Sequence, residues 1–95
     1  MPKTRQSDAD KLVKKHLGLV QSNNMKVASH VQRREGDWIV NTIMIEGYEV
    51  PFRFRRKQEY KNVKGARVNL TYYPDKLQVA GMELEIMKVV RIKVA

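Results

Sequence analysis

The chain has 95 residues, with 19 Lys and Arg against 10 Asp and Glu, so its formal net charge is +9. It contains no cysteine, which excludes disulfides and thiolate metal sites. It has no apolar run of membrane-spanning length, and its first residues lack the apolar core of a signal peptide. We therefore expect a single cytoplasmic domain whose positive charge favours a polyanionic partner, most often nucleic acid.

The first part of the chain predicts one helix. Residues 1–6 are polar and are expected to be flexible, and Ser7 is a favourable N-cap for a helix over 7–22. Apolar residues then recur at helical spacing at Leu12, Val13, Leu17 and Val20, with His16 on the same stripe and Lys11, Lys14 and Lys15 on the other side. His16 is expected to pack against the domain, and the three lysines either face solvent or extend a binding surface.

From residue 25 onward the pattern changes to strands. Apolar and polar residues alternate with a period of two, which is typical of half-buried strands. Strands are predicted near 25–34, 37–46, 48–57, 66–73 and 77–94. The segment 38–45 is apolar on both faces and predicts a central strand. The sequence at 73–76 predicts a turn, and the connector 57–65 is too short for a helical crossover, so its flanking strands are expected to be antiparallel.

These elements predict a mainly β (α+β) domain over residues 7–95. One N-terminal helix precedes about five mostly antiparallel strands, in a small curved sheet or a partly open barrel. The number and spacing of the strands resemble those of the OB-fold. The connector departs from that pattern, because the helix that an OB-fold usually carries between its third and fourth strands has no room in 57–65.

The strongest functional signal is a cluster of positive charge between Arg53 and Arg67. Seven of these fifteen residues are basic and one, Glu59, is acidic, which accounts for +6 of the net charge. The alternation predicts that Phe52, Phe54, Val68, Leu70 and Tyr72 point inward and that Arg53, Arg55, Arg67 and Tyr73 point outward. A regular array of outward guanidinium groups suits phosphate recognition.

Aromatic residues interleaved with these cations indicate single-stranded nucleic acid, since bases stack on rings while phosphates meet charge. The predicted binding residues are Arg53, Arg55, Lys57, Tyr60, Lys61, Lys64, Arg67 and Tyr73. The competing interpretation is a solvated face that Glu83 and Glu85 neutralise from a neighbouring strand. One continuous positive face would favour nucleic acid, whereas cations interrupted by acids would favour a protein-interaction module.

Trp38 also has two interpretations. In so small a domain most tryptophans belong to the core, whereas an exposed Trp38 at a strand end would indicate a stacking site.

Catalysis is not expected from this sequence. The two histidines, His16 and His30, fall on different predicted elements, and His30 is expected at the surface of a strand. No glycine-rich phosphate loop, zinc-ligand spacing or hydrolase elbow is present, so we expect no metal, no cofactor and no small-molecule substrate. The helix lacks the aromatic anchors of a membrane-surface helix.

The sequence therefore predicts a non-catalytic module that binds nucleic acid or a ribonucleoprotein with low sequence specificity. The alternative is a protein-interaction module or structural homodimer, built on an exposed strand edge or on the helix.

Overall fold

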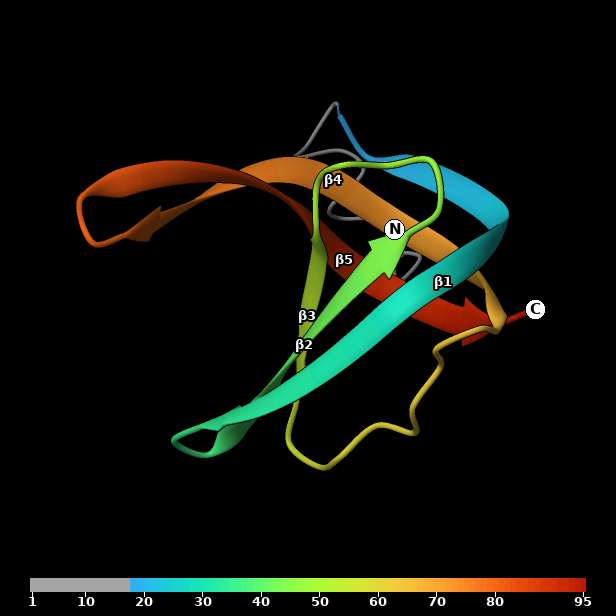
Figure 1. Cartoon of the computed structure of the whole chain (residues 1–95), viewed down its shortest axis with the longest axis horizontal. Coiled ribbons are helices and arrows are strands. Elements are labelled where there is room, and N and C mark those ends of the chain that lie inside the picture. Colours follow the sequence, from blue (N-terminus) through green and yellow to red (C-terminus); the bar gives the residue numbers. More distant parts are fainter. Residues whose placement is uncertain (1–17) are drawn as a thin grey trace, which may run out of the picture.

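The computed structural model describes residues 18–95, and in this part of the chain five strands form one sheet (Figure 1). The strands are β1 (Val20–Glu35), β2 (Trp38–Ile45), β3 (Phe52–Arg56), β4 (Arg67–Val79) and β5 (Met82–Val94). No helix occurs in residues 18–95, and none of them therefore crosses a membrane as a helix. The prediction of a mainly β fold is confirmed.

The sheet closes on itself into a ring. The strands follow one another in the order β1-β2-β3-β5-β4, and β4 pairs back with β1. Four of the pairings are antiparallel, whereas β3 and β5 are parallel and pair over only two residues each. The strands on either side of the connector run in opposite directions, as predicted, but they do not pair because β5 lies between them.

The predicted helix over 7–22 is not supported. Residues 7–17 lie outside the described part of the chain, and so do the predicted roles of Lys11, Lys14, Lys15 and His16. Where the structure begins, Gly18 is in a turn and β1 starts at Val20. Val20 lies opposite Tyr72, and this pairing with β4 outweighs the weak helical pattern of the segment.

The turn predicted at 73–76 is wrong. β4 runs straight through Pro74 and pairs with β5 as far as Val79, where Ala80 and Gly81 make the turn. Both turn residues have positive φ, 51° and 80°, which matches the twist of a tight two-residue hairpin connection. The last predicted strand, 77–94, therefore corresponds to the end of β4 and the whole of β5.

The core lies inside the ring, and in β3 and in β4 before Tyr73 it follows the predicted alternation. Phe52, Val68 and Leu70 are fully buried, and so are Val27 of β1 and Ile43 of β2. The rings of Phe52 and Tyr72 meet edge to face, with centroids 4.9 Å apart. The inward set predicted from the period of two is confirmed, because one face of each strand has to be removed from water.

The connector between β3 and β4 packs across one end of the ring. Val63 is 2% exposed and belongs to the core, and half-buried Tyr60 packs edge to face on Phe54 at 5.5 Å. Backbone bonds join the connector to β1, from Gly65 N to Val27 O (2.8 Å) and from Val27 N to Ala66 O (2.9 Å). The connector thus covers apolar side chains that would otherwise face water.

His30 holds the connector from inside the ring, so the prediction that it lies at the surface is wrong. Its Nδ1 accepts from the Val63 backbone N–H at 3.0 Å, and its Nε2 lies 2.8 Å from Oδ1 of fully buried Asn41. A ring nitrogen that accepts an N–H carries no proton, so Nε2–H donates to Asn41. Both buried polar groups are satisfied by this arrangement.

Alkaline pH is expected to destabilise the fold through two tyrosines. Burial raises the pKa of Tyr72 above its ordinary 10.0, and burial together with nearby Asp75 raises the pKa of Tyr73. The folded state therefore holds these protons more tightly, so the stabilisation is complete below about pH 10 and is lost as the pH rises through the raised values. Urea unfolding at pH 8 and pH 11 measures the loss. It should be smaller in Tyr72→Phe/Tyr73→Phe, and an equal loss in this variant would contradict the assignment.

Candidate nucleic-acid interface

Two hairpins extend beyond the ring and enclose a groove. The β1–β2 hairpin forms one side and the β4–β5 hairpin the other (Figure 1). The groove has a volume of about 590 Å³. Its lining combines aliphatic side chains, two arginines and two acids: Val31, Val40, Leu77, Val79, Leu84, Ile86, Arg33, Arg53, Glu35 and Glu85. A ligand in this groove would meet both apolar surface and positive charge.

Strand register brings half of the predicted cluster to this groove. Arg53 and Arg55 lie opposite Thr42 and Val40 of β2, on the outer side of the ring. Lys88 of β5 pairs with both Arg53 and Tyr73, which places these three residues in one row across β3, β5 and β4. We call this surface the groove face and define it by Arg33, Trp38, Arg53, Arg55, Lys57, Tyr73 and Lys88.

Trp38 is part of the groove face and not of the core. Its side chain is 39% exposed at the start of β2. The Lys57 ammonium lies 4.6 Å from the ring centroid, and the Arg55 guanidinium lies 5.8 Å from it. The core interpretation is therefore wrong, and the exposed alternative holds. The ring and two cations together offer stacking surface and charge at one place.

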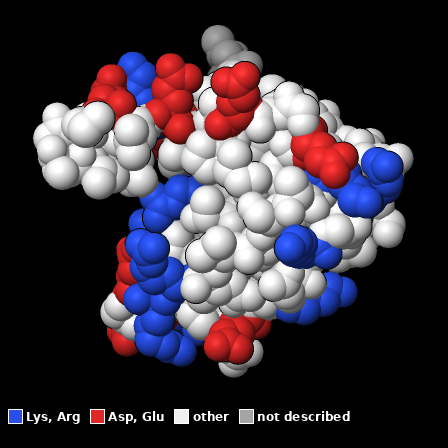
Figure 2. Space-filling model, in the orientation of Figure 1, with Lys and Arg blue, Asp and Glu red and all other residues white. Residues whose placement is uncertain are grey.

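A basic seam continues from the groove face between β3 and β5. Because these strands stop pairing after Arg53 and Lys88, a depression of about 200 Å³ opens there. Four cations line it, Arg55, Arg56, Lys88 and Arg91, over an apolar floor that includes Phe54 and Ile92, and no acid is among its lining residues. Figure 2 shows Lys and Arg side chains gathered beside the recess between the hairpins, with Asp and Glu on the β4–β5 hairpin.

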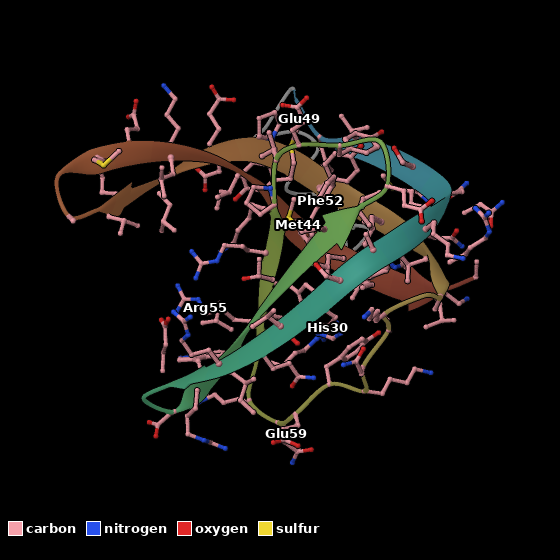
Figure 3. The ribbon with its side chains drawn as sticks, in the orientation of Figure 1. His30, Met44, Glu49, Phe52, Arg55 and Glu59 are labelled. Carbon is pink, nitrogen blue, oxygen red and sulfur yellow. The ribbon has the colours of Figure 1, made fainter. Side chains whose placement is uncertain are left out.

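Acids also lie beside the groove face: Glu35 and Asp75 line a hollow of about 310 Å³ together with Arg53, Arg55 and Lys88. Within residues 18–95 the one ion pair joins Lys76 and Glu83 at 3.4 Å, and both side chains are exposed. Glu85 lines the groove but forms no ion pair with its arginines. In Figure 3, Arg55 projects from β3 on the side where the two hairpins diverge. Glu35 of β1 and Glu85 of β5 therefore interrupt both walls of the groove, whereas the lining of the seam is wholly basic among its charged residues.

The remaining predicted residues lie elsewhere. Tyr60 is half-buried against Phe54, and the Arg56 guanidinium lies 5.2 Å from its ring centroid, so its ring serves packing. Lys61 and Lys64 are exposed on the connector at the end of the ring. Arg67 is exposed at the start of β4 and donates from Nη1 to the Asn24 carbonyl at 3.1 Å. The predicted cluster is thus divided between two surfaces.

Sequence reasoning missed several cations of this interface. Arg33 occupies the outward phase of β1, and Lys88 and Arg91 come from β5, some 35 residues after Arg53 in the chain. The outward phase was readable from the alternation only for Arg91, because a bulge in β1 after Val27 and a shift in β5 before Arg91 turn Arg33 and Lys88 outward, against the predicted phase. The position of all three residues beside Arg53 and Arg55 was not readable, because it depends on the order of strands in the ring.

No group of three or more His, Cys, Asp or Glu residues in the described part of the chain could hold a metal ion. Comparison with protein-family models, with curated proteins and with solved structures found no match. The interpretation of the groove face therefore depends on its own geometry and charge.

Proposed function

We propose that this protein is a non-catalytic module that binds nucleic acid, alone or in a ribonucleoprotein, through the groove face. Phosphates would contact Arg53, Arg55 and Lys57, while bases stack on Trp38. The observation that carries the proposal is an exposed tryptophan with two cations within 6 Å, next to a seam lined by four cations and no acid. Phosphate contacts and ring stacking are both insensitive to base identity, so sequence specificity is low.

The arrangement of strands supports this proposal. We interpret the ring as a small OB-like barrel, in which the connector takes the place of the helix that usually covers one end. OB-folds bind oligonucleotides on the face of their second and third strands, between the loops that follow the first and fourth. The groove face lies on β2 and β3, and the turns at 36–37 and 80–81 flank it. This is an analogy of fold, and the charge supplies the independent argument.

A protein partner is the alternative, and the tip of the β4–β5 hairpin favours it. Met82, Val79 and Leu84 are 63%, 44% and 42% exposed there. Clustered aliphatic side chains of this kind are found at protein–protein contacts. They offer no charge to a phosphate, so a ligand that depends on them should bind independently of salt.

Trp38 supplies a direct test, because it is the only tryptophan in the chain. Short labelled single- and double-stranded DNA and RNA are titrated at two salt concentrations, with anisotropy and Trp38 fluorescence recorded together. We expect quenching of Trp38 with micromolar or tighter affinity that weakens steeply with salt, since each neutralised phosphate releases counterions. The variant Arg53→Gln/Arg55→Gln/Lys57→Gln should lower the affinity of the quenching phase at least tenfold. It should also reduce the salt slope by about 2, at about 0.7 per contact for a single strand.

The control is Lys26→Gln/Arg67→Gln/Lys93→Gln, which removes the same number of charges from another surface and should leave the quenching phase unchanged. Equal weakening of the affinity in both triple variants would mean that the net charge alone determines binding, which would contradict a groove-face site. Absence of binding by the wild-type protein at low salt would leave the protein-partner alternative.

A further inference from the structure

A second basic surface lies on the opposite side of the ring. It comprises the outer side of β1 before residue 27, of β4 before residue 72 and of β5 after residue 90. Register places Lys26 opposite Arg67, Asn69 opposite Lys93, and Thr71 opposite both Arg91 and Gln21. We call this surface the rear face and define it by Lys26, Arg67, Arg91, Lys93, Gln21, Asn69 and Thr71.

The rear face contains no Asp or Glu among these residues. One acid, Glu46, borders this face beside Lys26, since its backbone N–H donates to the Lys26 carbonyl at 3.0 Å, whereas Glu35 and Glu85 line the groove itself. Lys26 and Arg67 are direct cross-strand partners, and like charges in such a pair destabilise a sheet. An anion bound between them would remove this repulsion.

The connector adds a further cation beside this surface. The bond from Gly65 N to Val27 O holds the end of the connector next to β1, one residue from Lys26. Lys64, exposed and adjacent to Gly65, lies at this edge. Lys64 and Arg67, which the sequence assigned to one cluster with Arg53, therefore belong to the rear face and its margin.

The chemistry of the rear face differs from that of the groove face. Its neutral members are amides and a hydroxyl: Asn69 Oδ1 accepts from the Asn24 N–H at 2.9 Å, and Thr71 lies 3.4 Å from Gln21 Oε1. No aromatic residue and no large exposed apolar residue is among its defining residues. Thr71 is only 8% exposed, so contacts to sugar and phosphate fall to the cations and to the amides of Gln21 and Asn69, which offer nothing on which a base could stack.

We propose that the rear face is a second nucleic-acid site that contacts only the sugar–phosphate backbone, and that the protein therefore bridges two nucleic-acid segments. The rear-face site stands by itself, whereas bridging also rests on the proposed function of the groove face. Arg91 borders both surfaces, since it lines the seam and lies opposite Thr71, whereas Lys26, Arg67 and Lys93 lie on parts of β1, β4 and β5 that the groove face does not include, so a second short oligonucleotide has its own contacts there.

Energy transfer between two oligonucleotides tests bridging. Ten-nucleotide single strands carrying either a donor or an acceptor are mixed at low salt and titrated with the protein. We expect transfer to rise with protein and to fall again in excess protein, when each oligonucleotide has its own protein molecule. Lys26→Gln/Arg67→Gln/Lys93→Gln should lower the affinity for the second oligonucleotide at least tenfold and abolish transfer, while Trp38 quenching persists.

The groove-face variant makes the two proposals separable. In Arg53→Gln/Arg55→Gln/Lys57→Gln, transfer and Trp38 quenching should disappear, while an anisotropy change remains from the rear face. Loss of that residual change only when Lys26, Arg67 and Lys93 are also replaced would support the rear site even if Trp38 is never quenched. Transfer that persists in the rear-face variant, or a wild type that quenches Trp38 with one oligonucleotide bound and no transfer, would overturn the proposal. Circular dichroism of each variant verifies that it is folded.

Discussion

Phe52→Ala is expected to lower the free energy of unfolding by about 3–5 kcal/mol, the usual cost of truncating a buried phenylalanine. Phe52 is 0% exposed at the point where β3 pairs with both β2 and β5. Its ring packs edge to face on Tyr72 at 4.9 Å and on Tyr48 at 5.4 Å. The substitution leaves a cavity beside the shortest pairing of the ring, where β3 and β5 share two residue pairs, so little other structure compensates for it.

Urea unfolding followed by circular dichroism measures this loss. Val31→Ala is the matched control, because Val31 is 55% exposed on the outer side of β1 and its truncation should cost less than about 1 kcal/mol. A loss below 1 kcal/mol for Phe52→Ala as well would mean that β3 does not close the ring as described.

His30→Leu is expected to cost about 2–4 kcal/mol and to release the connector. The leucine fills much of the space, but Oδ1 of Asn41 and the N–H of Val63 lose the partners that His30 supplies. Each buried polar group left without a partner costs about 1–3 kcal/mol. Because the Val63 bond is also the connector's polar attachment to the interior, the residues around it should open more readily than the rest of the sheet.

Limited trypsin digestion and hydrogen exchange measure that opening. Cleavage after Lys61 and Lys64 should accelerate in His30→Leu well before global unfolding. Gln32→Ala is the comparison, since Gln32 also bonds to the connector, through the backbone N–H and carbonyl of Tyr60, but at a partly exposed position where water can replace it. Its effect should be smaller than about 1 kcal/mol. Equal protection of the connector in His30→Leu and the wild type would contradict the role of the His30 bond in holding it.

The candidate site shows which features of a surface the local sequence can predict and which it cannot. The alternation correctly assigned Arg53, Arg55 and Arg67 to the outer side, because side-chain direction along a strand is a local property. It could not show that Arg53 and Arg67 lie on different faces, because residues that point outward can lie on any side of a closed ring. Register with β2 places Arg53 in the groove, and register with β1 places Arg67 on the rear face.

Trp38 and His30 show two limits of the local pattern. The period of two cannot tell which side of β2 is covered, because β2 is apolar on both sides, so the exposure of Trp38 stayed open. In β1 a bulge between Val27 and Ser29 exchanges the inward and outward phases, so His30 points into the ring beneath the connector and Val31 is 55% exposed. Both outcomes depend on segments distant in the sequence.

The sequence by itself determined that the chain after residue 25 forms strands, the inward residues of β3 and of β4 before Tyr73, and the excess of positive charge, because periodicity and composition are local. Only the tertiary structure decided that Pro74 lies within a strand, that β5 separates β3 from β4 and that the basic cluster divides between two faces. Strand order is set by which edges bury the most apolar surface and satisfy the most backbone groups together. That balance involves the whole chain at once, so the order of the strands cannot be predicted from any single segment.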